Sequence, residues 1–414
     1  MSLSDDTNRD IKFFLRVFNQ FTGERKEGVD NILTSIKRDI ETTEKAIQML
    51  QNKKIKFKLQ ENVRLTKTDL FNVDVVPSNV KRNIENNNNG IFTLKCKVLN
   101  VDVKINLLLM DERDFNRLKF LERKLIYALK MVYFCLMYKN NKRMKSLDVY
   151  LYLSNEKKIL PESNVTILSL NECNTAVTYA CSERGSILIF REEEWKKVLL
   201  HELFHSLCLD FSMEKYKDLK NNIKKLYNIK SDFEISETYT EFWATIVNSC
   251  YTSYMIMEDK SNISNYLTYA IFFIQMEKVF SLFQCVKILD FMGLRYVNLI
   301  SNTQIDKSFR DLLYRENTNV FAYYILKMVL LFNVNDFLLF CKRANTNILS
   351  FDKTPQNFTK LSNFIKENYK SENILDSLVK MELFYNKFKK GYNGSNKDVI
   401  SNTMRMTMIN LKLK

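Results

Sequence analysis

Both histidines of this 414-residue chain lie in one short segment, His201-Glu202-Leu203-Phe204-His205. In an α-helix, residues four apart lie about 40° from each other around the axis, so both imidazoles project from one face. The opposite arc is apolar and consists of Leu199, Leu200, Leu203, Phe204 and Leu207. The segment therefore predicts a helix that turns one face to an apolar core and carries two imidazoles on the other.

Two neutral imidazole nitrogens on one helix face can bind a Zn²⁺ ion. Glu202 lies about 100° from His201 on the same side, within reach of a water molecule on the metal. Random placement of only two histidines would give this pattern on the order of one time in a thousand. We therefore predict zinc ligands at His201 and His205 and a catalytic base at Glu202. The alternative is two histidines on a helix surface without a metal.

We expect the third protein ligand to be a carboxylate, because the chain contains no other histidine. Downstream, Glu237 and Glu241 lie four residues apart and share a helix face. The opposite face is apolar and carries Ile235, Tyr239, Phe242, Trp243 and Ile246. Such a pair can be a plain solvated face, but beside the histidine segment it supplies candidate ligands.

The pattern HExxH followed on a later helix by ExxxE resembles the gluzincin branch of the zinc metallopeptidases. The resemblance implies that Glu237 is the third zinc ligand and that Glu241 is an outer carboxylate orienting a ligating histidine. The gap of 32 residues between His205 and Glu237 is longer than in thermolysin. The reverse assignment, with Glu241 as the ligand, therefore stays open.

A wider stretch, residues 172–250, resembles uncharacterised metallopeptidases of large DNA viruses of eukaryotes. The resemblance is carried by residues 174–178, 189–198 and 201–211. It implies a viral protein located in the host cytoplasm or in the virion.

Around this segment, alternating patterns predict strands at 99–108, 147–153, 165–170, 174–180 and 186–190. A β-type composition also marks residues 65–76 and 92–110. Helices are predicted at 112–138, 192–209, 214–230 and 233–251, with Glu192, Glu193 and Glu194 in the first turn of the second. The zincin fold has the order strand, backing helix, strand, strand, edge strand, strand, active helix. The resemblance thus implies that 174–180 is the edge strand and that Asn174 and Thr178 contact substrate; the alternative is a polar turn.

The flanking regions read as helical. Seven glycines and three prolines disfavour a β-sandwich or barrel, which needs many tight turns. We predict an α+β, predominantly helical fold. A zincin-like catalytic domain at 58–258, with a small mixed sheet, a backing helix and the HExxH helix, lies between helical regions at 1–57 and 259–414.

The eight cysteines are widely spaced and form no CxxC, which favours reduced thiols in a cytoplasmic protein. The start of the chain has no basic and apolar leader pattern. The most apolar stretch, 323–341, is interrupted by polar residues such as Lys327 and Asp336, so no membrane span is predicted.

The function predicted from these patterns is zinc-dependent hydrolysis of a peptide or protein substrate. With no histidine left to stabilise the oxyanion, a tyrosine, an arginine or zinc alone has to do so; Tyr227, Tyr239 and Tyr251 are candidates by proximity in sequence. One alternative is an inactive zincin-fold interaction protein. Another is nucleic-acid binding, which the net charge of +15 suggests, although the lysines are spread along the chain.

Overall fold

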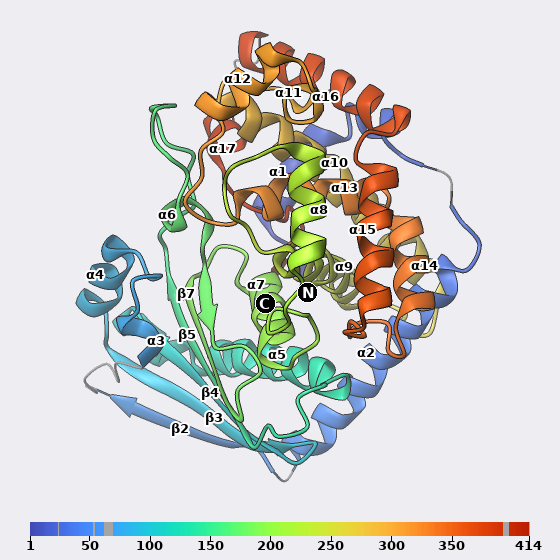
Figure 1. The fold of residues 1–414 in the computed structure, drawn as a ribbon. Coiled ribbons are helices and arrows are strands. Elements are labelled where there is room, and N and C mark those ends of the chain that lie inside the picture. The colour runs from blue at the N-terminus through green and yellow to red at the C-terminus, as the bar shows by residue number, and fades with distance from the viewer. Residues whose placement is uncertain (24, 53, 62–68, 392–396, 414) are drawn as a thin grey trace.

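The computed structural model describes residues 1–413 except 24, 53, 62–68 and 392–396. One side of the molecule is a six-stranded mixed sheet in the order β2-β3-β4-β5-β7-β6 (Figure 1). The strands are β2 (Lys56–Glu61), β3 (Gly90–Val98), β4 (Val101–Leu109), β5 (Ser146–Ser154), β6 (Ala176–Thr178) and β7 (Arg184–Arg191). The predicted α+β class, mainly helical with a small mixed sheet, is confirmed.

Pairing within the sheet changes direction twice. β2, β3 and β4 are antiparallel, and the tight turn between β3 and β4 places Leu99 and Asn100 at φ 45° and 66°. β4, β5 and β7 are parallel, which requires crossover connections. β6 is antiparallel to β7 and forms the edge of the sheet. The predicted edge strand therefore lies at an edge, in shorter form than 174–180.

The strand predicted at 165–170 is absent. This segment makes one isolated bridge, between Leu168 and Glu316, and then enters the short helix α6 (Leu170–Cys173). Val165 and Ile167 are 75% and 44% exposed, so their apolar pattern does not reflect a buried sheet face. The β-type segment 65–76 lies partly outside the described residues, and its remainder includes the helix α3 (Asp69–Asn72).

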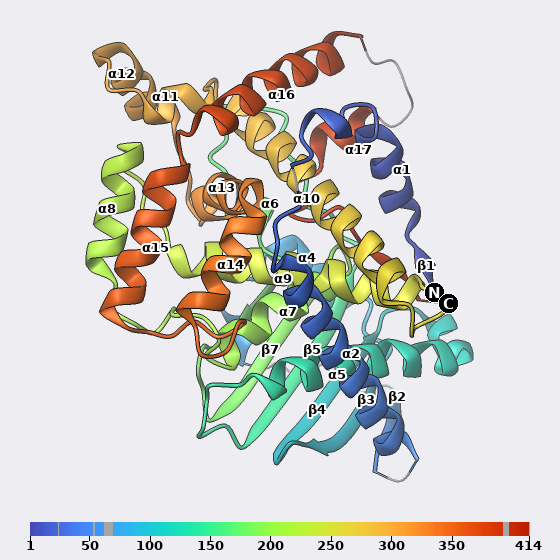
Figure 2. The same cartoon turned by 90° about the vertical axis from the view of Figure 1, so that its right-hand side faces the viewer.

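Of the helices in the N-terminal part and in the sheet region, α3, α4, α5 and α7 contact the sheet, whereas α1 and α8 lie beside the helices α10 and α15 (Figures 1 and 2). The crossover helix α5 packs between the sheet and α2. The bounds are α1 (Asp5–Phe14), η1 (Phe18–Gln20), α2 (Val29–Gln51), α4 (Ser78–Asn86), η2 (Glu112–Arg117), α5 (Leu118–Met137), α7 (Trp195–Ser206), α8 (Lys217–Tyr227) and α9 (Ile235–Ile256).

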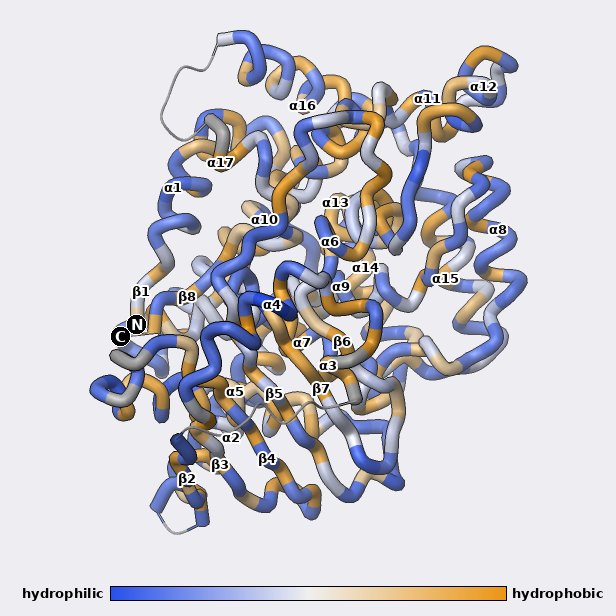
Figure 3. The backbone as a smooth tube through the Cα atoms, turned by 90° about the vertical axis from the view of Figure 1, so that its left-hand side faces the viewer, coloured by the Kyte–Doolittle hydropathy of each residue, from blue (hydrophilic) through white to orange (hydrophobic). Residues whose placement is uncertain are grey.

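The remaining helices form a second, helical layer, of which α10, η3 and α13 contact α9. They are α10 (Ile263–Phe291), α11 (Tyr296–Ile300), α12 (Gln304–Leu313), η3 (Phe321–Leu326), α13 (Lys327–Phe332), α14 (Val334–Ala344), α15 (Pro355–Asn368), α16 (Glu372–Gly391) and α17 (Lys397–Asn402). Peripheral helices such as α8 and α16 alternate hydrophilic and hydrophobic residues (Figure 3). In α8, Leu219, Ile223 and Tyr227 form the buried stripe. The 214–230 stretch is therefore an amphipathic surface helix.

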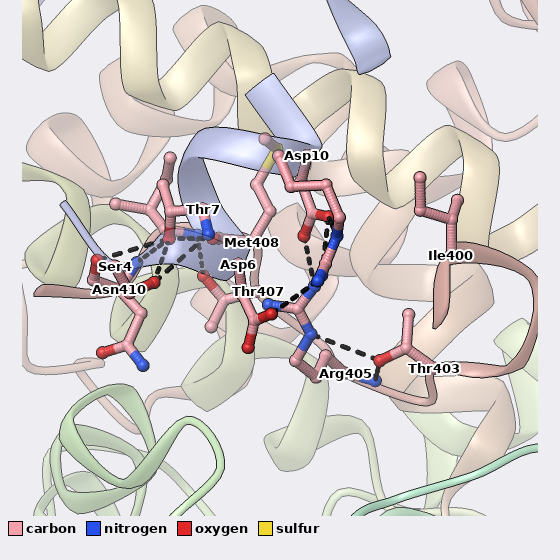
Figure 4. A network of polar contacts seen from close by, with 12 residues as sticks. Ser4, Asp6, Thr7, Asp10, Ile400, Thr403, Arg405, Thr407, Met408 and Asn410 are labelled. Carbon is pink, nitrogen blue, oxygen red and sulfur yellow. Dashed lines mark hydrogen bonds and ion pairs between the residues drawn. The ribbon is translucent and has the colours of Figure 1, made fainter. Parts of the chain in front are cut away.

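Residues 403–413 return from the helical layer into the core. They end in β8 (Leu411–Lys412), which pairs with β1 (Ser2–Leu3). Arg405 forms a buried ion pair with Asp10, and the Thr7 hydroxyl donates to the Met408 carbonyl at 2.7 Å (Figure 4). Helices from all three predicted regions share one apolar core. The division at 57 and 258 stays a prediction.

Cys181 and Cys208 form a disulfide, so the prediction that all eight cysteines are reduced is wrong for this pair. The two residues are brought together because the turn after β6 lies against the end of α7: the N–H groups of both donate to the carbonyl of His205. Among the helices of the described ranges, no single one is long and apolar enough to span a membrane. Two consecutive segments, Phe321–Phe332 and Val334–Ala344, would pass that test together but are bent by 90°.

Candidate metal centre

Helix α7 carries the histidine segment and is buried along its whole length. Only residues 192–194 separate its start from the end of β7, so the sheet fixes the position of its first turn. The three glutamates expected in its first turn precede it instead, with Glu194 at the N-cap. The Glu194 carboxylate accepts hydrogen bonds from the N–H groups of Met406 and Thr407 at 2.6 and 2.5 Å, and it pairs with Lys158. Glu194 thus binds the 403–413 segment, whereas Glu192 pairs with Lys124 and Glu193 accepts from the N–H of Lys158.

Three potential ligand atoms converge beside α7. The Nε2 atoms of His201 and His205 are 3.1 Å apart, and Glu237 Oε2 lies 3.1 and 3.4 Å from them. A tetrahedral zinc ion with bonds of about 2.1 Å holds neighbouring ligand atoms about 3.4 Å apart. Each histidine is 7% exposed, which leaves the ligand atoms little contact with water. The three side chains therefore have the chemistry and spacing of a zinc site.

A carboxylate stands behind each imidazole. Glu241 Oε1 lies 2.9 Å from His201 Nδ1, and Asp210 Oδ2 lies 2.7 Å from His205 Nδ1. Such contacts fix the ring orientation and leave Nε2 free for a metal. The arrangement brings Glu237 to the inner position and Glu241 to the outer one, as the resemblance implies. Asp210 was not selected from the sequence, although it follows His205 by only five residues.

Glu241 is held by two lysines from separate helices. It is 2% exposed and forms ion pairs with Lys197 of α7 and with Lys327 at the start of α13. Burial alone would raise the pKa of Glu241, but the two ammonium groups hold it well below its ordinary value. Glu241 therefore remains a carboxylate, in a fixed position behind His201.

Protonation in this site follows the balance of burial and charge. Burial opposes protonation of both imidazoles, yet Glu237 and Glu241 raise the pKa of His201, and Glu237 and Asp210 raise that of His205. For Glu202, burial is the largest influence and raises its pKa above the usual carboxyl value. A carboxylate so placed is suited to accept and return a proton near neutral pH.

Tyr323 also reaches the site. Its hydroxyl donates to Glu237 Oε2 at 3.1 Å, and its ring centre lies 6.3 Å from that of His201. Tyr323 belongs to η3, a π-helical turn, a form often found at functional sites. Burial, followed by the charges of Glu237 and Glu241, raises its pKa well above the usual tyrosine value. Tyr323 therefore keeps its proton as a donor.

The tyrosines selected by proximity in sequence are wrong choices. The hydroxyls of Tyr227, Tyr239 and Tyr251 bond to the Tyr296 hydroxyl and to the carbonyls of Leu349 and Lys130. The sequence did not indicate Tyr323, because it lies 86 residues beyond Glu237 and no local pattern marks it.

The two predicted substrate contacts lie at the sheet edge. The Thr178 hydroxyl donates to the carbonyl of Ser186 at 2.7 Å, and Asn174 Oδ1 accepts from the Thr318 hydroxyl at 3.5 Å. Within the described part of the chain, β7 alone pairs with β6. The outer backbone groups of β6 can thus pair with an extended peptide, while the role of the two side chains stays a prediction.

No family model matches this chain, and no solved structure matches it. It is similar to the uncharacterised protein R210 of Acanthamoeba polyphaga mimivirus, with 27% identity over 175 residues. The match covers 40% of this chain and 41% of the viral protein. This similarity points toward a viral origin and carries no information on activity.

Proposed function

We propose that this protein is a zinc-dependent metallopeptidase of viral origin with a zincin-like catalytic core. The observation that carries the proposal is the convergence of His201 Nε2, His205 Nε2 and Glu237 Oε2 at 3.1 to 3.4 Å. A chance cluster of buried polar groups has no reason to leave three ligand atoms facing one point while carboxylate oxygens lie 2.9 and 2.7 Å from the two Nδ1 atoms.

The sheet supports the zincin-like part of the proposal. β4, α5, β5, β6, β7 and α7 follow one another in the expected order, apart from the missing strand at 165–170. An antiparallel edge strand next to the strand that enters α7 is suited to align an extended substrate by main-chain hydrogen bonds. A peptide or protein is therefore the proposed substrate.

Each side chain then has a chemical task. Zn²⁺ held by the three ligands would polarise a substrate carbonyl and lower the pKa of a water molecule. Glu202 takes a proton from the attacking water and returns it to the leaving amine nitrogen. The Tyr323 hydroxyl is placed to donate to the oxygen that gains negative charge as the carbonyl is attacked. Glu241 and Asp210 keep both imidazole rings in position.

The first test is the metal content of the purified full chain, without added zinc. About one zinc per chain is expected, and it should be lost in His201→Ala and in Glu237→Ala. Glu258→Ala, an exposed substitution just beyond α9, is the matched control and should keep the metal. Zinc retained by Glu237→Ala would refute the ligand assignment.

The second test separates a peptidase from an inactive zincin-fold protein. Wild-type protein should cleave members of a fluorogenic peptide library, and Glu202→Gln should keep zinc and lose cleavage. Cleavage by zinc-loaded Glu202→Gln at the wild-type rate would contradict the assigned base.

A further inference from the structure

A second candidate site lies in the helical layer and shares no residue with the metal centre. It is a cavity of about 390 Å³ bounded by residues 20–23, α10, the start of α14 and α16. Three lysines and two aspartates line it: Lys26, Lys278, Lys380, Asp336 and Asp376.

Lys278 is the unusual member of this lining. Its side chain comes from α10 and is 6% exposed, and its Nζ lies 4.2 Å above the ring centre of Phe332. Within the described part of the chain, this ammonium group has no hydrogen-bond or ion-pair partner. Burial accordingly lowers the pKa of Lys278 to about 8. A buried cation without a counter-charge is costly unless a ligand supplies one.

Gln275 lines the same cavity one turn before Lys278. It is 8% exposed, and its Oε1 atom has no hydrogen-bond partner. A buried amide oxygen in this state accepts a hydrogen bond readily, for instance from a hydroxyl group. Two buried polar side chains that lack partners therefore face one cavity.

The first turn of α14 closes the cavity on the other side. This helix has 11 residues, no side chain caps its start, and Asn333 and Val334 line the cavity. The first N–H groups of a helix are unpaired within it and attract anions. Asp336 in the same turn is already neutralised by Lys26, at 2.6 Å. Asp376 is exposed, so the buried part of the cavity is positive.

We propose that this cavity binds a phosphoryl group, either inorganic phosphate or the phosphate of a small phosphorylated compound. The Lys278 ammonium and the Val334 N–H at the start of α14 bond to its oxygens, and Gln275 accepts from a hydroxyl. This site is independent of the proposed peptidase activity.

The test is calorimetric titration of the full chain at constant ionic strength, with inorganic phosphate and with glycerol 3-phosphate. We expect one saturable site, weakened at least 10-fold in Lys278→Met and unchanged in Lys353→Met and His201→Ala. Tighter binding of glycerol 3-phosphate would identify a phosphorylated compound as the ligand, and the opposite order would identify phosphate itself. No saturable binding of either probe, or equal binding by Lys278→Met, would overturn the proposal.

Gly23 supplies a second variant that keeps Lys278. A Cβ atom at Gly23 would lie 3.8 Å from the Lys278 nitrogen, an ordinary van der Waals contact. Gly23→Asp should place a carboxylate where the phosphoryl group binds, so it should abolish phosphate binding and raise the melting temperature. Gly23→Asn, of equal size and no charge, should leave the melting temperature below that of Gly23→Asp. Phosphate binding by Gly23→Asp at wild-type affinity would contradict the site.

Discussion

Lys327 and Glu241 form a fully buried ion pair in which Nζ lies 3.2 Å from Oε2. The same Nζ donates to the carbonyl of Met406 at 2.5 Å. One ammonium group therefore connects the carboxylate behind His201 to the 403–413 segment. Removing it would leave a buried carboxylate short of charge and a buried carbonyl without a donor.

We expect Lys327→Met to lower the free energy of unfolding by roughly 3 kcal/mol. This is the lower end for breaking a buried ion pair, because Glu241 keeps Lys197 as a partner. Zinc affinity should fall as well, since His201 loses a firmly held neighbour. Urea unfolding and competition with a zinc chelator measure the two effects. Lys342→Met, on the exposed side of α14, is the control. A Lys327→Met protein as stable as that control would show that the ion pair adds nothing to the free energy of unfolding.

Tyr323→Phe should lower kcat/KM about 100-fold with little change in zinc content, because only the hydroxyl donor is lost. Steady-state kinetics on the best library peptide would check this. The matched control is Tyr239→Phe, whose hydroxyl bonds to the backbone of Leu349 instead. Equal rates for both variants would remove Tyr323 from the reaction.

Glu316 should make stability depend on pH. Burial raises its pKa to about 7, against an ordinary value of 4.5. The folded chain therefore binds more protons than the unfolded chain between these values, and the stability from this group is lost as pH rises from about 4.5 through 7. The full loss is up to roughly 3 kcal/mol.

Glu316→Gln should reduce this loss. The free energy of unfolding of the variant, relative to that of wild type, should therefore be higher at pH 8 than at pH 5. Denaturant midpoints at both pH values test this. Glu372→Gln, at the exposed start of α16, should show no such difference. A pH-independent effect of Glu316→Gln would mean that the carboxyl does not titrate in this range.

The disulfide between Cys181 and Cys208 closes a loop with a sequence separation of 27. Loop-closure entropy predicts a loss of about 3 to 4 kcal/mol when both residues are replaced by serine. Unfolding of wild type with reductant should match that of the double variant. Replacing Cys96, a free thiol that is only partly buried, by serine is the control and should change the midpoint much less. Identical midpoints with and without reductant would show that no disulfide forms.

The local part of the candidate site was predictable from the sequence. His201 and His205 share a face because of helix geometry, and Glu237 and Glu241 do so for the same reason. The spacing did not decide which glutamate lies inside; the positions of Lys197 and Lys327 do, by holding Glu241 behind His201.

Contacts between segments distant in the chain could not be predicted from the sequence. Tyr323 and Lys327 approach the site from a different helical element, and no short-range pattern records that approach. The strand at 165–170 failed for a related reason: an alternating apolar pattern says nothing about whether a sheet position is available to the segment. The fold class was predicted correctly because it depends on local periodicity summed over many elements.

The return of residues 403–413 into the core has a consequence for how the protein matures. The Glu194 carboxylate at the start of α7 accepts hydrogen bonds from the N–H groups of Met406 and Thr407, and Lys327 donates to the carbonyl of Met406. During synthesis, the histidine helix leaves the ribosome long before these residues do. The buried contacts that hold Glu194 and Lys327 are therefore completed only after residues 403–413 have been synthesised, so α7 and the carboxylate behind His201 gain this support late in folding.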